Sequence, residues 1–144
     1  MKITGSLLLS TLIALSAPWT SWADNALSMI VTVENIKNRE GKIAVTLFDS
    51  KEAYLKKPLG EKSAEIGPDR KAIARFDDLP KGVYPISIIH DINKNGSLDT
   101  SFLRIPKEPY AFSNNATGRF GPPKFEKTKF ALAPGKREIT IRFD

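Results

Sequence analysis

A run of polar side chains at residues 91–99, with the sequence DINKNGSLD, has the spacing that best fits metal chemistry in this 144-residue chain. Its first six residues match the pattern D-x-[DN]-x-[DN]-G that opens a calcium-binding loop. Oxygen atoms at alternate positions can converge on a hard cation as the chain curls, and the glycine permits the sharp turn. The predicted ligands are Asp91, Asn93, Asn95, the backbone carbonyl of Ser97, and Asp99.

The same segment departs from an EF-hand. Phe102 stands at the twelfth position, where an EF-hand carries a bidentate Glu, and the preceding residues have the pattern of a strand. With only two carboxylates we expect weak calcium binding, in the roughly 0.1 to 1 mM range of extracellular modules. A further ligand could come from Glu108, Asn114 or Asn115. The alternative is a metal-free turn in which Asn and Asp side chains cap backbone N–H groups.

Other chemistry is restricted by the composition, because the chain has one histidine and no cysteine. Thiolate metal sites, disulfides and cysteine nucleophiles are therefore excluded. A hydrolase or lyase would have to use His90 with the neighbouring Asp91 or Asp99, and no G-x-S-x-G motif accompanies them. We expect a protein without catalytic residues, and the enzyme stays as the alternative.

The first 23 residues have the features of a secretory signal peptide. Lys2 gives the positive end, residues 7–15 are mostly apolar, and Ser21-Trp22-Ala23 offers the small residues that a signal peptidase requires. The apolar run is shorter than the roughly 20 residues of a membrane span. We therefore expect residues 1–23 to be removed, leaving residues 24–144 as a periplasmic or secreted domain without a membrane span.

The elements that must position these residues are predicted to be strands. Apolar and polar residues alternate at 29–34 and 43–48, and the turn at 38–41 contains a glycine, so we expect these segments to form a hairpin. We also expect one helical turn within residues 50–58. Further strands are predicted at 71–76, 82–90, 128–132 and 137–143. Short strands separated by Gly and Pro turns predict an all-β fold, an antiparallel sandwich of about seven strands.

Two segments do not fit this simple pattern. Pro85 lies inside a predicted strand and cannot donate a hydrogen bond, so we expect an edge strand or a bulge there. Residues 103–125 show little periodicity but are too apolar for disorder, and we expect them to form one long ordered loop over an end of the sandwich. This loop would present Tyr110, Phe112, Asn114, Asn115 and Phe120 to a ligand or partner.

Several of these segments resemble known domains. The sequence FDDLPKGVY at 76–84 is similar to a turn of prealbumin-like β-sandwich domains. The combination of DINKNGSLD with IPKEPYAFSNNATGRFGPPKFEKTKFAL resembles a family of exported bacterial proteins, domain of unknown function family 2141, over most of residues 27–143. The resemblance implies an exported β-sandwich in the bacterial envelope and brings no established activity.

The charge distribution favours a solvated surface over a nucleic-acid interface. The 22 Lys and Arg and 16 Asp and Glu are interspersed along the chain. We therefore expect no nucleic-acid partner, and instead an envelope protein, a glycan or a small ligand. The leading hypothesis is a non-enzymatic exported sandwich whose calcium loop supports a binding loop. A second alternative is an accessory module that binds envelope polysaccharide through exposed aromatic and basic side chains.

Overall fold

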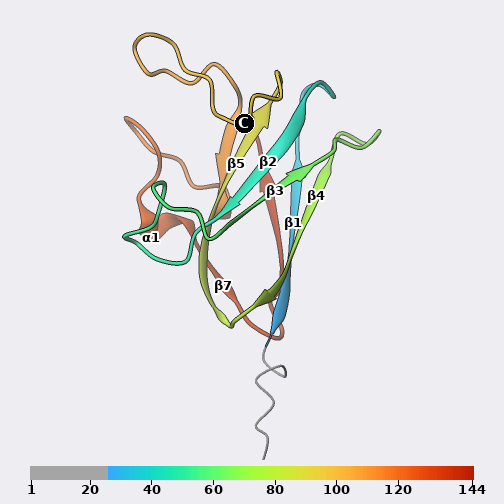
Figure 1. The fold of residues 1–144 in the computed structure, drawn as a ribbon, viewed down its shortest axis with the longest axis vertical. Coiled ribbons are helices and arrows are strands. Elements are labelled where there is room, and N and C mark those ends of the chain that lie inside the picture. The colour runs from blue at the N-terminus through green and yellow to red at the C-terminus, as the bar shows by residue number, and fades with distance from the viewer. Residues whose placement is uncertain (1–25) are drawn as a thin grey trace, which may run out of the picture.

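The computed structural model describes residues 26–144, which form two β-sheets that face each other (Figure 1). The three-stranded sheet has the order β4 (Ala72–Leu79), β1 (Leu27–Glu34), β8 (Glu138–Arg142). The five-stranded sheet has the order β3 (Gly60–Ala64), β2 (Lys42–Leu47), β5 (Gly82–Asp91), β6 (Tyr110–Phe112), and β7 (Lys129–Leu132) also pairs with β5. A 3-10 turn, η2 (Ser113–Asn115), and a short helix, α1 (Phe125–Thr128), complete it. The predicted β-sandwich is confirmed, while the predicted signal peptide lies outside the described residues.

The core lies between the two sheets and is supplied by alternate residues of each strand. The inward positions of β1 are Met29, Val31 and Val33, and all three are fully buried. Alternate residues of β2 (Ile43, Val45, Leu47) and of β5 (Ile86, Ile88) are also fully buried. All residues of this core lie between Leu27 and Phe143. A chain that starts at Asp24 therefore contains every core residue that residues 26–144 supply.

The hairpin predicted for residues 29–34 and 43–48 is wrong. β1 pairs with β4 and, in parallel, with β8, whereas β2 pairs with β3 and β5 in the other sheet. The connection crosses between the sheets, and Asn35, with φ of 61°, fixes its start by donating from Nδ2 to the carbonyl of Phe143 at 2.6 Å. Alternation predicts that a segment is a strand but does not name its partner. The pairing of β1 with β8 is parallel, whereas the other strand pairings within residues 26–144 are antiparallel.

The expectation of an edge at Pro85 is met only locally, because β5 as a whole lies inside its sheet while Gly82–Pro85 pair with β7 alone. One side of β5 pairs with β2, from Ile86 to Asp91. The other side of β5 pairs with β7 at Gly82–Pro85 and with β6 at Ser87–Ile89. Pro85 stands where the partner changes from β7 to β6. The Pro85 carbonyl accepts the N–H of Phe48 at 3.0 Å, so the Pro85 nitrogen also faces the β2 side of β5. The pairing of β2 with β5 ends at Leu47 and Ile86, so the missing N–H falls just beyond this pairing, where it is tolerated.

The region expected as one long loop is divided into several elements. Residues 110–112 form β6, which pairs with β5, and η2 and α1 follow at 113–115 and 125–128. β3 at residues 60–64 was not expected either, because its sequence GEKSA has no apolar alternation. It forms an edge strand, where charged residues are common.

The turn within residues 50–58 forms as predicted. The Ser50 hydroxyl accepts a hydrogen bond from the Ala53 N–H at 3.2 Å, and the Tyr54 N–H donates to the Ser50 carbonyl at 3.0 Å. Leu55 then adopts φ of 57° and stays exposed. This exposed leucine lines an apolar groove on the outer face of the five-stranded sheet.

Candidate functional site

Asp91 organises the bend that follows β5. Its side chain is fully buried, and its two carboxylate oxygens accept hydrogen bonds from the backbone of Asn95 at 3.0 Å and of Gly96 at 2.9 Å. Gly96 has φ of 82°, which a side chain would strain. A buried carboxylate needs such donors because its desolvation is otherwise unfavourable. Asp91 thus serves as the anchor of the whole bend.

Two of the other predicted ligands, Asn93 and Asn95, donate hydrogen bonds to Asp99. Asn93 Nδ2 donates to Asp99 Oδ2 at 2.6 Å, and Asn95 Nδ2 donates to Asp99 Oδ1 at 2.8 Å. Asn95 Oδ1 accepts the N–H of Ser97 at 2.9 Å. The structure therefore brings the five predicted residues into one cluster of hydrogen bonds.

Of the three residues named as further ligands, only Glu108 lies at the bend. Its buried carboxylate accepts hydrogen bonds from the N–H of Ile92 at 2.9 Å and of Asp99 at 3.1 Å, which closes the base of the loop. Asn114 instead donates to the carbonyls of Lys127 and Lys129. Asn115 accepts the N–H of Arg142 at 2.9 Å, on the other side of β6.

The side-chain oxygens of the bend are of the type that binds a hard cation, but those of Asp91, Asn93, Asn95 and Asp99 already accept hydrogen bonds. Among residues 26–144 there is no group of three or more His, Cys, Asp or Glu side chains placed to hold a metal. A cation would have to draw in the amide oxygens of Asn93 and Asn95, which now accept backbone N–H groups. The bend is therefore complete as a hydrogen-bonded turn, and calcium would replace part of that network.

His90 has a structural environment. The ring is 1% exposed and lies 6.1 Å from the Phe143 ring, centroid to centroid. Its Nε2 is 2.7 Å from the carbonyl oxygen of Glu40, which can only accept, so Nε2 carries the proton. A substrate cannot reach this ring without local opening of the sandwich. The geometry therefore gives the hydrolase or lyase hypothesis no support.

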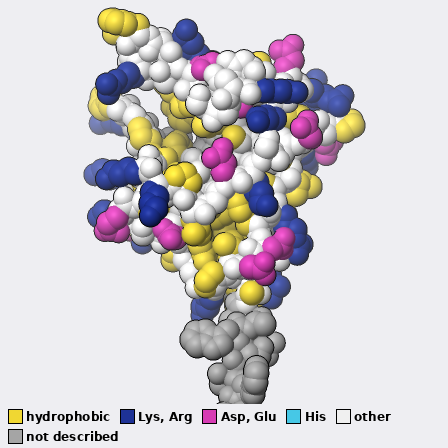
Figure 2. Space-filling model, viewed as in Figure 1, with side chains coloured by type: hydrophobic (Ala, Val, Ile, Leu, Met, Phe, Trp, Pro, Cys, Tyr) yellow, Lys and Arg dark blue, Asp and Glu magenta, His cyan; other side chains and the backbone are white. Residues whose placement is uncertain are grey.

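An apolar groove of about 590 Å³ lies on the outer face of the five-stranded sheet. Ser87 and Ile89 of β5 contribute to its floor, and Tyr110 and Phe112 of β6 continue it, with their rings edge to face at 6.0 Å. Figure 2 shows hydrophobic side chains lining a hollow beneath the uppermost loop of the molecule. The side chains that complete the groove are Leu55, Leu98, Thr100, Leu103, Arg104, Ile105 and Phe120.

The bend at 91–99 positions one wall of this groove. The chain continues through Leu98 into residues 100–107, where the N–H of Ser101 donates to the Ile105 carbonyl at 2.8 Å. The N–H of Lys107 donates to the Asp99 carbonyl, also at 2.8 Å, so both ends of this wall are joined to the bend. The bend therefore helps to hold this wall of the groove in place.

Tyr54 fixes the opposite wall. Its hydroxyl donates to the carbonyl of Pro123 at 3.0 Å, and its ring meets those of Phe48 and Phe125 edge to face. Burial raises the pKa of Tyr54, so this hydroxyl stays protonated at neutral pH. The contact holds residues 116–124, including Phe120, beside the turn that carries Leu55.

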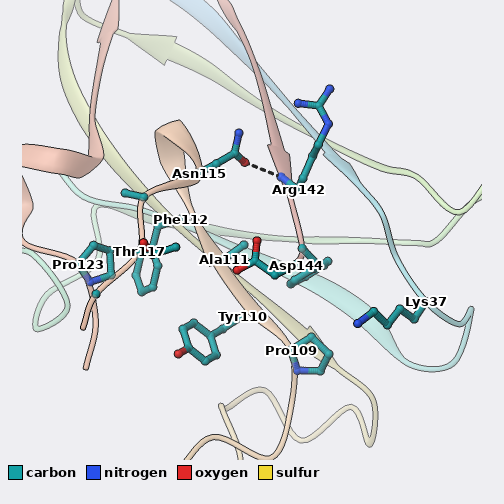
Figure 3. Close-up of a pocket in the computed structure, with 13 residues that line it drawn as sticks. Lys37, Pro109, Tyr110, Ala111, Phe112, Asn115, Thr117, Pro123, Arg142 and Asp144 are labelled. Carbon is teal, nitrogen blue, oxygen red and sulfur yellow. Dashed lines mark hydrogen bonds between the residues drawn. The ribbon is translucent and has the colours of Figure 1, made fainter. Parts of the chain in front are cut away.

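A second hollow of about 490 Å³ lies on the other side of β6, near the C-terminus (Figure 3). The Arg142 side chain points away from it, and its guanidinium is paired with Glu34 at 2.9 Å. Asn115 is engaged by the Arg142 backbone, as the dashed line in Figure 3 marks. Because these polar groups already serve the fold, the apolar groove is the better candidate site.

Comparison with known proteins identifies the family. The sequence pattern of a family described as "uncharacterized protein conserved in bacteria (DUF2141)" matches residues 31–140. The chain belongs to this family. The DUF2141 match extends from β1 to β8, so it includes the bend and the groove. No curated protein and no solved structure matches the chain.

Part of this site was predicted from the sequence. Tyr110, Phe112 and Phe120, predicted for a binding loop, all line the groove, whereas Asn114 and Asn115 make backbone contacts elsewhere. The floor positions on β5 were not singled out, because alternation alone does not say that an outward face is covered by distant loops. No helix among residues 26–144 is long and apolar enough to cross a membrane.

Proposed function

We propose that this protein is an exported, non-enzymatic binding protein that holds a small, mainly apolar molecule in the groove. The observation that carries the proposal is the groove itself, about 590 Å³ in volume and lined by aliphatic and aromatic side chains. Ligand sites of small molecules fall in this size range and have few polar groups. Both walls are fixed by hydrogen bonds to the fold, which reduces the ordering that binding would require.

The polar groups of the groove define the ligand further. Ser87 and Thr100 offer hydroxyls, and Arg104 offers a cation at the mouth. A ligand with an apolar body and one polar or anionic end would use these groups best. The wide apolar floor favours a flat or elongated body over a sugar, whose many hydroxyls would lose water without finding partners.

The first prediction concerns the floor of the groove. In Ser87→Trp the large ring fills the space between β5 and β6, so an apolar probe should lose most of its binding. The measurement is the fluorescence titration of N-phenylnaphthylamine, an uncharged probe. Thr32→Trp, on the outer face of the other sheet, is the matched control and should bind the probe normally. Equal binding by both variants, or no binding by the unmodified protein, would reject the groove as a site.

Calcium at the Asx-rich bend is the second candidate, favoured by the convergence of Asp91, Asn93, Asn95 and Asp99. At about ten times its dissociation constant, calcium should stabilise the fold by about 1.4 kcal/mol and raise Tm by a few degrees. Asp99→Asn should remove the shift, because it takes away the carboxylate that both amides face. Absence of heat and of a thermal shift at about 10 mM calcium would establish the metal-free turn instead.

Export is inferred from the N-terminal sequence, with cleavage before Asp24. A periplasmic or secreted location suits a binding protein that meets its ligand, or an envelope partner, outside the cytoplasm. Binding of envelope polysaccharide is the competing hypothesis. It predicts retention on glycan columns by the exposed aromatic side chains, with no effect of Ser87→Trp.

A further inference from the structure

Two phenylalanines beside the groove are exposed to an unusual degree. Phe102 is 100% exposed and Phe120 is 97% exposed, although the chain buries five other phenylalanines: Phe48, Phe76, Phe112, Phe130 and Phe143. Phe120 lines the groove, and Phe102 precedes Leu103, which lines it from the other wall. Leu103 and Ile105 are also mostly exposed. Large apolar side chains gathered at loop tips are typical of a docking surface.

The loops that carry these side chains are basic. Residues 100–107 and 116–124, which we name the rim loops, contain no Asp or Glu and carry Arg104, Lys107, Arg119 and Lys124. The Arg119 guanidinium lies over the Phe120 ring, 5.7 Å from its centroid. Figure 2 shows dark-blue and yellow side chains close together around the upper loops.

The outer face of the other sheet is different. Its cations are neutralised within the sheet, since Lys71 pairs with Glu34 and Arg75 pairs with Asp77, both at 2.7 Å. Its largest exposed apolar side chain, Ile73, is 64% exposed and is flanked by these ion pairs. None of the ion pairs formed within residues 26–144 involves the four cations of the rim loops, so the combination of such cations with exposed aromatic rings is a property of these loops.

We propose that the rim loops dock this protein on the surface of an anionic bilayer. Aromatic side chains prefer the interface between headgroups and acyl chains, and cations beside them are attracted to anionic headgroups. The uniform positive charge of the rim loops complements such a surface, and the exposed rings would insert beside the headgroups. The groove then opens toward the membrane, although docking does not depend on a ligand in the groove.

The experiment is co-sedimentation of residues 24–144 with lipid vesicles, after circular dichroism has shown that each variant is folded. This form avoids the apolar segment before residue 24, which would itself bind lipid. Vesicles rich in phosphatidylglycerol should bind the protein, and vesicles of phosphatidylcholine should bind it much more weakly. Phe102→Ser/Phe120→Ser should weaken binding by about tenfold, whereas Ile73→Ser, the matched control, should bind normally.

The cations have their own test. Arg104→Gln/Arg119→Gln should reduce binding to anionic vesicles by about fivefold per cation removed, and added salt should reduce that of the unmodified protein. Lys62→Gln/Lys81→Gln serves as the control. Failure to bind anionic vesicles, equal loss in the control variants, or a stable dimer held together by the two phenylalanines would overturn the proposal. Ser87→Trp should retain vesicle binding, so failure of the groove and failure of the rim loops are distinguishable.

Discussion

At the scale of single residues, the bend at 91–99 shows how a calcium-like sequence can be satisfied by its own backbone. Asp91 and Glu108 are buried carboxylates, and each accepts two backbone N–H groups. Such bonds to charged acceptors are stronger than neutral ones, so they can offset the desolvation of the two groups. The same pattern of residues would present oxygens to a cation, which is why the sequence alone left both interpretations open.

Gly41 is required by the close approach of β2 to this bend. It has φ of 72°, and a Cβ atom there would overlap the carbonyl oxygen of Asp91. Gly41→Ala should therefore destabilise the protein by about 2 kcal/mol or more, since the neighbouring atoms are backbone. Urea unfolding measures the effect. Gly135→Ala is the control, because nothing lies within 4 Å of the added methyl group, and a loss as large as that of Gly41→Ala would contradict the argument.

At the scale of elements, a single side chain bridges the junction of β6 and β7 on β5. Pro85 pairs with Lys129 of β7, and pairing with β6 begins at Ser87. The N–H of Ile86, between the two partners, donates instead to the buried hydroxyl of Ser113 at 3.0 Å. The Ser113 hydroxyl in turn donates to the carbonyl of Thr128. One side chain thus joins three segments where no strand fills the gap.

Removal of the Ser113 hydroxyl tests this junction. Ser113→Ala leaves the buried N–H of Ile86 without a partner and should destabilise the fold by about 1 to 3 kcal/mol. Hydrogen exchange of the Ile86 amide should become faster in the same variant. Ser63→Ala, at an exposed position on β3, should change stability by less than about 0.5 kcal/mol. Unchanged exchange at Ile86 would mean that the hydroxyl is not its acceptor in solution.

At the scale of the whole molecule, the first and last strands close the sandwich. β8 pairs with β1 in parallel, so the C-terminus lies at the same end of the molecule as the bend (Figure 1). Glu34, the last residue of β1, forms ion pairs with Lys71 at 2.7 Å and with Arg142 at 2.9 Å. The three segments of this sheet are therefore also tied together by charge.

The Glu34 ion pairs make stability depend on pH. The hydrogen bond from Lys71, together with the charges of Lys71 and Arg142, lowers the pKa of Glu34 below its ordinary value. A lowered pKa in the folded state means that the unfolded state binds the proton more readily, so this contribution is present at neutral pH and is lost as the pH falls below about 4. Glu34→Gln should reduce the difference between urea midpoints at neutral and acid pH.

The reduction should be partial, because hydrogen bonds from Ser28 and Arg75 lower the pKa of Asp77 in the same direction, and one from Lys129 lowers that of Glu126. Glu61→Gln, at an exposed position on β3 outside the ion pairs of residues 26–144, is the control. If Glu34→Gln and Glu61→Gln change the pH dependence equally, the ion pairs are not its source.

The sequence by itself determined the all-β fold, most of the strands, the family resemblance and the Asx-rich bend. These features are local: alternation with a period of two, Gly and Pro turns, and side chains that bond to backbone a few residues away. Tyr110, Phe112 and Phe120 could be singled out for the same reason, as aromatic residues in a stretch without a regular pattern.

Only the tertiary structure decided which strands are neighbours and where the ligand-sized space lies. β1 and β2 alternate alike, yet they belong to different sheets, because pairing depends on which faces must be buried together and not on adjacency in the chain. The groove combines a strand floor with walls from three separate segments, and Glu108 reaches back across the loop to the N–H groups of Ile92 and Asp99. Such contacts between distant residues leave no periodic trace in a single sequence.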